Sequence, residues 1–149
     1  MRIRAKYHFK VKTNLKSLDE VLDKFNQLDR ASIPTKDWFQ CQLALVEGFT
    51  NAVRHAHKNL SSNISIDIEL TFFEGSMEIR IWDYGPPFDL DAYIKNLSKR
   101  KNNMSGGGRG IPILQKIADR LSYFRTSDNR NCLLIVKHFS PPEPNLTDE

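Results

Sequence analysis

The sequence predicts an α+β fold in two layers, a two-layer α/β sandwich with helices on one face of a mixed, mostly antiparallel sheet. Three observations lead to this prediction. Polar and hydrophobic residues alternate in several short segments, as they do in strands with one buried face. In three other segments, apolar residues recur at helical spacing. These helical segments fall at two places along the chain instead of alternating with the strands, which argues against a Rossmann fold.

The first predicted elements are a strand and two helices. Residues 2–12 alternate between apolar and mostly basic side chains, which predicts a half-exposed strand. Residues 14–30 carry apolar side chains at helical spacing, and either Asn14 or Ser17 can cap this helix. A longer helix is expected over 35–58, because an apolar stripe runs along it.

The second half of the chain is predicted to complete the sheet. A short Glu-Gly-Ser turn separates two alternating segments, which is typical of an antiparallel hairpin. A long polar segment ending in glycines follows, and loops of that length in a compact domain are usually functional. The predicted elements are a hairpin (64–72 and 77–82), a loop (89–108) with a short helix around 90–97, a helix (111–121) and a last strand pair (121–126 and 132–139).

Length and composition indicate an ordinary globular chain. The 149 residues suit one domain, expected over residues 1–139, and the proline-rich, acidic segment 140–149 is expected to be a disordered tail. The longest apolar run falls far short of the ~20 residues of a membrane span, so no membrane is expected as a partner. Two cysteines, Cys41 and Cys132, are too few for a disulfide framework, and reduced thiols in a cytoplasm are the better interpretation.

The formal net charge is +4, and basic side chains gather at the beginning of the chain. No basic run is interleaved with aromatic residues for stacking, so direct binding of nucleic acid is not expected. A basic face suits an acidic protein or a polyphosphate at least as well. The amphipathic strand over 2–12 also offers an edge for dimerisation, which makes a homodimer one expectation.

Glu47, Asn51 and His55 form the first candidate site, because their spacing of four places them along one side of the predicted helix. An amide oxygen is a ligand that Mg²⁺ accepts, and a carboxylate one turn away can take a proton from a nearby hydroxyl. The same spacing also occurs on ordinary polar helix faces. This helix alone therefore does not distinguish a site from a solvated surface.

Asp83 lies where a predicted strand ends, and Gly85 and two prolines follow it. A carboxylate at that point can accept one directional hydrogen bond from a ligand amine, such as the exocyclic amino group of adenine. The glycine removes a side chain where the ligand ring would lie. A simple turn explains the segment as well, since Asp-x-Gly-Pro is also good turn chemistry.

Four of the seven glycines lie in a cluster directly before the last predicted helix, together with Arg109. The backbone N–H groups of such a cluster can surround phosphates, aided by the helix dipole. A flexible linker is the alternative interpretation. The cluster is not the Walker pattern, because no Gly-Lys-Ser/Thr follows it.

In this order, the three motifs resemble those of the GHKL (Bergerat-fold) ATP-binding superfamily. The resemblance rests on EGFTNAVRHAH, DYGPPFD and GGGRGIPIL, and it covers the chain up to about residue 139. Within that superfamily, the chain is most similar to the small bacterial anti-sigma regulatory factors, which are serine/threonine protein kinases with a histidine kinase-like ATPase domain.

The resemblance implies a role for each motif residue. Asn51 is expected to ligate the Mg²⁺ that bridges the ATP phosphates, and Glu47 to be the general base that activates a serine hydroxyl or water. Asp83 is expected to bind the adenine amino group, and Gly85 to line the adenine pocket. A movable lid over about 90–108 is expected to cover the phosphates. The other residues expected at ATP are His55, Gly106, Gly108, Arg109 and Gly110.

The resemblance also implies a function in the cytoplasm. The chain is expected to phosphorylate an anti-sigma antagonist protein and to sequester a sigma factor, and thus to regulate transcription. The alternative is a non-catalytic ATP-binding or partner-binding switch module on the same fold. Glu47 favours the kinase, because nucleotide binding alone needs no general base. One departure from the family concerns the last strand, where some relatives place a threonine near the adenine and Cys132 stands close to that position.

Overall fold

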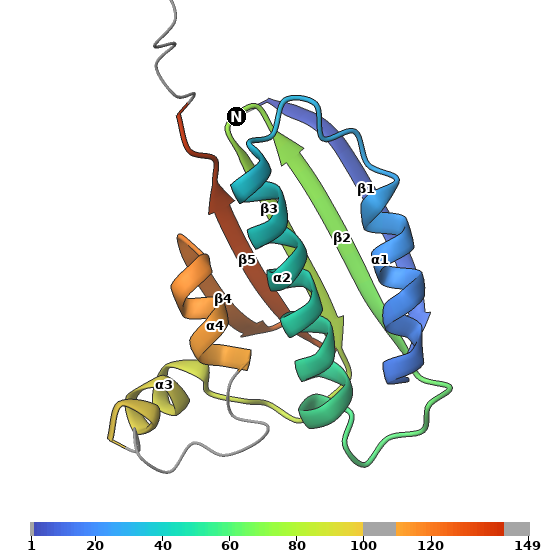
Figure 1. Ribbon diagram of the computed structural model, residues 1–149. Coiled ribbons are helices and arrows are strands. Elements are labelled where there is room, and N and C mark those ends of the chain that lie inside the picture. The colour runs from blue at the N-terminus through green and yellow to red at the C-terminus, as the bar shows by residue number, and fades with distance from the viewer. Residues whose placement is uncertain (1, 100–109, 142–149) are drawn as a thin grey trace, which may run out of the picture.

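The computed structural model describes residues 2–99 and 110–141, which form a five-stranded sheet with helices over one face (Figure 1). The strand order is β1-β2-β3-β5-β4, and neighbouring strands run antiparallel throughout. The predicted two-layer α+β architecture is therefore confirmed. The strands are β1 (Ile3–Lys12), β2 (Ser65–Phe73), β3 (Ser76–Asp83), β4 (Arg120–Arg125) and β5 (Asn131–His138).

The sheet differs in one detail from the mixed sheet of the prediction. The connection from β3 to β4 passes through two helices and returns β4 in the direction of β3. However, β5 lies between these two strands and pairs antiparallel with both. The pairings among the described strands are consequently all antiparallel.

The helices match the predicted segments, with small changes at their ends. Of the two candidate caps for the first helix, Asn14 is the one that acts, because its side chain accepts a hydrogen bond from the Lys16 N–H at 2.9 Å. None of the helices in the described ranges combines the length and apolar character that crossing a membrane requires. The helices are a 3₁₀ turn η1 (Leu15–Ser17), α1 (Leu18–Asn26), α2 (Thr35–Asn51), α3 (Leu90–Lys99) and α4 (Gly110–Ile117).

The helix predicted over 35–58 changes its winding near its end. After α2 stops at Asn51, a wider π turn, η2 (Ala52–Ala56), follows. The next residue, His57, is buried, and hydrogen bonds hold both of its ring nitrogens. The backbone N–H of His57 donates to the carbonyl oxygen of Ala52 at 2.9 Å, and this hydrogen bond closes the wide turn. Since π turns of this kind are frequent at functional sites, this end of α2 is a candidate functional site.

The core lies between the sheet and the helices. Phe25 of α1 stacks on Trp38 of α2 with 4.3 Å between the ring centroids, and Ile66, Ile68 and Leu70 of β2 are fully buried. Gly48 lets α2 approach β3 closely, because a Cβ on Gly48 would lie 2.6 Å from Cδ1 of Ile81. This packing holds the polar end of α2 beside the end of β3.

Candidate functional site

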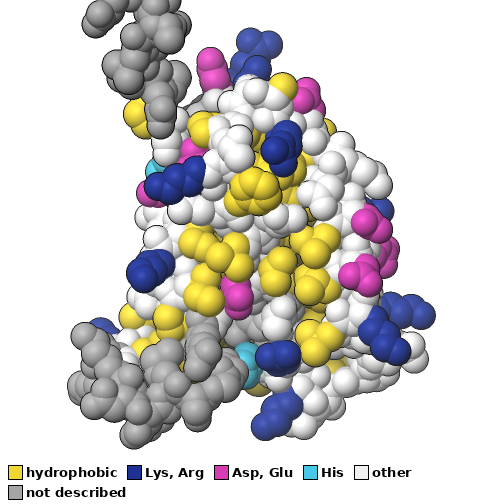
Figure 2. Space-filling view, viewed as in Figure 1, with side chains coloured by type: hydrophobic (Ala, Val, Ile, Leu, Met, Phe, Trp, Pro, Cys, Tyr) yellow, Lys and Arg dark blue, Asp and Glu magenta, His cyan; other side chains and the backbone are white. Residues whose placement is uncertain are grey.

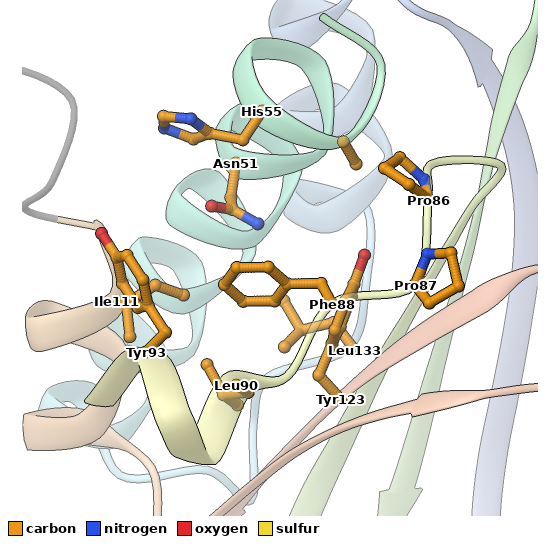
Figure 3. A pocket seen from close by; sticks show the side chains of 11 residues that line it. Asn51, His55, Pro86, Pro87, Phe88, Leu90, Tyr93, Ile111, Tyr123 and Leu133 are labelled. Atoms are coloured by element: carbon orange, nitrogen blue, oxygen red, sulfur yellow. The ribbon is translucent and has the colours of Figure 1, made fainter. Parts of the chain in front are cut away.

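A cavity of about 150 Å³ lies where α2 and β3 both end (Figure 3). Its walls come from the end of α2, the loop after β3, and the elements α3, α4, β4 and β5. Most of its surface is apolar, with a few polar groups, as is typical of ligand cavities. The aromatic side chains of the wall are Phe88, Tyr93 and Tyr123, and its polar side chains include Asn51 and His55.

The aromatic rings form a slot in this cavity. Phe88 lies at its centre in Figure 3, with its ring centroid 5.4 Å from that of Tyr93 and 5.8 Å from that of Tyr123. Phe88 is 45% exposed, so its ring still has surface to offer a ligand. A planar aromatic ligand suits such a slot, because stacked and edge-on rings attract one another.

The structure brings two of the three residues of the helix motif into the cavity. Asn51 ends α2 and His55 lies in η2, and both line the wall; Figure 3 shows the Asn51 amide pointing toward Phe88. Glu47 lies one turn earlier and is half-buried. Its Oε2 would lie 3.1 Å from a Cβ on Gly110, so the carboxylate faces the first residue of α4. A carboxylate at a helix N-terminus is electrostatically favoured.

The glycine cluster is described only at its last residue. α4 begins at Gly110, as expected for a helix that directly follows the cluster. Gly106, Gly108 and Arg109 lie outside the described residues, as do the second half of the expected lid and residues 142–149 of the expected tail. The described part of the lid is α3, which confirms the short helix expected around 90–97.

Asp83 ends β3, and three donors of the chain meet its carboxylate. Oδ1 accepts hydrogen bonds from the Gly85 N–H at 2.8 Å and from Nδ2 of Asn131 at 2.9 Å. Oδ2 accepts one from the Tyr123 hydroxyl. Burial raises the pKa of Tyr123, and its hydrogen bond to Asp83 raises that pKa further, so the hydroxyl remains a donor. Through Tyr123, Asp83 adjoins the cavity.

Gly85 holds the loop after β3 against the π turn. A Cβ on Gly85 would lie 2.7 Å from the carbonyl oxygen of Ala56 and 3.0 Å from its Cα. Nη1 of Arg125 donates to the Gly85 carbonyl oxygen at 2.9 Å from the other side. The position therefore has room for glycine alone.

Tyr123 and Asn131 were not predicted; in the last strand only Cys132 was named, as close to the position where some relatives have a threonine near the adenine. In the sheet, Asn131 is paired with Asp83, whereas Cys132 is paired with Trp82. Because side chains alternate between the two faces of a sheet, Cys132 lies on the face away from Asp83. The sequence pattern does not single out Asn131, since it is the last residue of a continuous polar run, 125–131, before the apolar ones.

His57 is a further residue that the motif analysis missed. Its Nε2 accepts a hydrogen bond from the Tyr84 N–H at 2.8 Å, and its Nδ1 lies 2.7 Å from Oγ1 of Thr13. Because Nε2 accepts, Nδ1 carries the proton in the neutral ring. Burial lowers the pKa of His57, and the charge of Asp83 opposes this only in part. Neutral His57 thus ties β1 to the start of the loop after Asp83.

The residues described include no group of three or more His, Cys, Asp or Glu side chains that could hold a metal ion. A Mg²⁺ ion that arrives on phosphate groups needs only one or two protein oxygens, however. The Asn51 amide, half-buried in the cavity wall, is a ligand of that kind. The donor set therefore fits a phosphate-borne Mg²⁺ and not a metal held by the protein alone.

Comparisons with known proteins were made for the whole chain. The family model described as histidine kinase-like ATPase domain matches residues 11–137. A protein of Staphylococcus epidermidis named serine-protein kinase RsbW is 28% identical over 103 residues, which cover 66% of this chain and 65% of that protein. Its namesake in Bacillus subtilis is 31% identical over 85 residues, which cover 54% of this chain and 52% of that protein.

These matches span less than two thirds of the length of the relatives. Among solved structures, the crystal structure of the RsbU and RsbW domains of a Mycobacterium tuberculosis protein superposes with a TM-score of 0.67 at 13% identity. The superposition covers 96% of this chain and 35% of that chain. At such an identity the likeness concerns the fold alone.

Proposed function

Because this chain belongs to the histidine kinase-like ATPase domain family, which implies ATP binding, we propose that it phosphorylates a serine or threonine of a protein partner. The proposal rests chiefly on one geometry. The carboxylate of Glu47 faces the start of α4, and one turn farther along the Asn51 amide lies in the wall of an aromatic cavity. The name serine-protein kinase that relatives carry supports the same class of reaction.

In this proposal, the adenine base lies among Phe88, Tyr93 and Tyr123, with its amino group toward Asp83. The rings offer apolar surface to the base, and Asp83 supplies one directional acceptor. Gly85 adds no side chain to the pocket. The phosphates extend from there toward the start of α4. The residues proposed to contact ATP beyond the base are Asn51, His55, Gly106, Gly108, Arg109 and Gly110.

Glu47 is proposed as the general base of the transfer. It accepts the proton of the substrate hydroxyl as that oxygen attacks the γ-phosphate of ATP, while the bond from the γ-phosphorus to the bridging oxygen breaks and ADP leaves. The free N–H groups at the start of α4 favour negative charge on the phosphates beside it. The Asn51 amide would hold Mg²⁺ on the phosphates, and the ion would supply positive charge that offsets the charge of the transferred group. The chain's own contribution is thus mostly positioning, which is what phosphoryl transfer requires.

We propose that residues 1–139 form one ATP-binding domain with a lid over about 90–108. The described part of this lid, α3, places Leu90 and Tyr93 in the cavity wall. A displacement of α3 would therefore open the proposed base pocket. Nucleotide binding and lid position are coupled in this way.

The proposed partners are a sigma factor, which the chain sequesters, and an antagonist protein, which it phosphorylates. Figure 2 shows hydrophobic side chains gathered on the helix-bearing face, and on α2 Phe39 is 53% and Leu43 is 42% exposed. Exposed apolar groups of this kind mark protein-binding surfaces. β1, at the edge of the sheet, offers an edge for a second copy. A cytoplasmic location follows from these partners and accords with the buried, free thiols of Cys41 and Cys132.

The kinase proposal is tested by incubating the protein with radiolabelled ATP and the small candidate antagonists encoded by neighbouring genes. Label on a serine or threonine of one antagonist is the expected result. ATP binding in calorimetry without label on any candidate would favour the non-catalytic switch module. A failure to bind ATP at all would contradict the proposed site.

A further inference from the structure

The carboxylate of Asp83 has little acceptor capacity left for a ligand. Each carboxylate oxygen offers about two lone pairs. Oδ1 already accepts from the Gly85 N–H and from Nδ2 of Asn131, at 2.8 and 2.9 Å. Oδ2 accepts from the Tyr123 hydroxyl, and Asp83 as a whole is only 2% exposed. A ligand donor must therefore approach Oδ2, directly beside the hydroxyl of Tyr123.

The two side chains that bind Asp83 differ in how firmly they are held. Asn131 is fixed at both ends of its amide, since its Oδ1 accepts from Arg125 at 3.3 Å and its Nδ2 also faces the carbonyl oxygens of Gly85 and Pro86, at 3.1 and 3.0 Å. The hydroxyl hydrogen of Tyr123, in contrast, changes partner by rotation about a single C–O bond. Tyr123 also lines the cavity (Figure 3). It is the group at Asp83 that can turn toward a ligand.

The chemistry of the base then determines what the hydroxyl meets. The edge of adenine presents the amino donor at C6 next to an acceptor, the ring nitrogen N1. If the amino group donates to Oδ2 of Asp83 and the edge that carries N1 faces the cavity wall, N1 lies on the side of Tyr123. The hydroxyl can leave Oδ2 for N1 without leaving any polar group unpaired, because the amino group replaces it on Asp83.

Resting on the proposed placement of adenine at Asp83, we propose that Tyr123 is a specificity-determining residue whose hydroxyl donates a hydrogen bond to N1 of the base. Asp83 and Tyr123 together then select a base whose edge carries a hydrogen-bond donor next to a hydrogen-bond acceptor. Guanine and hypoxanthine carry the reverse pair, an oxygen at C6 beside an N1–H. They would set an oxygen directly against Oδ2 of the carboxylate, and the repulsion between these two acceptors disfavours them.

The test compares ATP with 1-deaza-ATP, in which N1 is replaced by C–H, by calorimetry on the full chain. The parent protein is expected to bind 1-deaza-ATP about three- to tenfold more weakly than ATP, the effect of one neutral hydrogen bond. Tyr123→Phe is expected to bind both nucleotides equally, because it lacks the hydroxyl that donates to N1. Tyr7→Phe removes a tyrosine hydroxyl on β1, outside the cavity wall, and is expected to keep the parent's discrimination. The comparison of ATP with 1-deaza-ATP is made first on the parent protein, so this part of the test does not depend on the folding of a variant.

Two results would overturn the role of Tyr123. One is equal affinity of the parent for ATP and 1-deaza-ATP; the other is a Tyr123→Phe protein that discriminates between the two nucleotides as the parent does. The latter would mean that a group other than the Tyr123 hydroxyl contacts N1. The placement of adenine is tested separately with purine riboside triphosphate, which lacks the 6-amino group. If the parent binds that nucleotide as tightly as ATP, Asp83 does not bind the amino group and the proposed site itself is wrong.

Discussion

Replacing Gly85 with alanine is expected to displace the loop after Asp83 and thereby to weaken both folding and ATP binding. The added Cβ would lie 2.7 Å from the carbonyl oxygen of Ala56 and 3.0 Å from its Cα and Cβ. Ala56 belongs to the π turn that ends at His57, whose ring is held by two hydrogen bonds. Unlike the tip of a long side chain, these atoms cannot rotate away, so the loop or the turn must move.

The magnitude follows from this contact. Overpacking costs about 1–3 kcal/mol, and the lower backbone entropy of the unfolded alanine chain returns about 0.4–1 kcal/mol. We therefore expect the free energy of unfolding of Gly85→Ala to fall by about 1–2 kcal/mol, measured by urea denaturation. Since the loop carries the base pocket, ATP affinity in calorimetry is expected to fall at least about tenfold.

The chain offers a matched control for this substitution. Gly75 lies in the turn between β2 and β3, and a Cβ there would meet nothing within 4 Å. Gly75→Ala is expected to change the free energy of unfolding by less than about 0.5 kcal/mol and to leave ATP affinity unchanged. If both alanine variants matched the parent in stability and in ATP affinity, the argument from close packing at Gly85 would be refuted.

Three more predictions concern single side chains. Asp83→Ala leaves buried donors unpaired, so it should lower ATP affinity at least about tenfold and the free energy of unfolding by about 1–3 kcal/mol. The parent should bind GTP poorly. ATP affinity of Asp83→Ala equal to that of the parent in calorimetry would contradict the assignment of Asp83. Burial lowers the pKa of His57 below its ordinary 6.5, so on acidification the unfolded chain takes up the proton first and stability falls below about pH 6.5, by at most about 1.4 kcal/mol per pH unit. Urea denaturation from about pH 7.5 to about pH 5 should show a smaller decline for His57→Gln, and an unchanged decline would count against this role of His57. Burial raises the pKa of Cys41 to about 12 and that of Cys132 to about 11, so iodoacetamide at about pH 8 should label both only after unfolding in urea, as mass spectrometry would show; fast labelling of the folded protein would be the contrary result.

The strands and the helix motif were predictable from local patterns. Alternation in the segments 64–72 and 77–82 follows from one buried sheet face, and the structure has β2 and β3 there with the expected antiparallel pairing. The spacing of Asn51 and His55 placed them on one side of a helix, and both line the cavity even though the turn between them is wider than an α-turn. Local periodicity was sufficient for these features.

The surroundings of Asp83 depend instead on contacts between distant segments. Asn131 and Tyr123 reach Asp83 because β5 lies between β3 and β4 and sets the register of both. Alternation alone leaves such a register open, so it does not show that Asn131 lies opposite Asp83. The π turn likewise depends on the distant partners that hold His57. Spacing within one helix does not contain that information.

Glu47 is proposed to serve phosphoryl transfer to the protein substrate and not nucleotide binding. Glu47→Gln keeps the size and shape of the side chain but cannot accept the proton, while Asn51→Ala removes the proposed Mg²⁺ ligand and should impair binding and transfer together. Glu20→Gln makes the same chemical change as Glu47→Gln on the exposed surface of α1 and should leave both properties unchanged.

The decisive measurement sets the ATP affinity of Glu47→Gln, from calorimetry, beside its transfer of radiolabelled phosphate to the protein substrate. We predict that affinity stays within about threefold of the parent while transfer falls about 10²–10⁴-fold. Transfer at the parent's rate by Glu47→Gln would contradict the proposed general base and the kinase mechanism built on it.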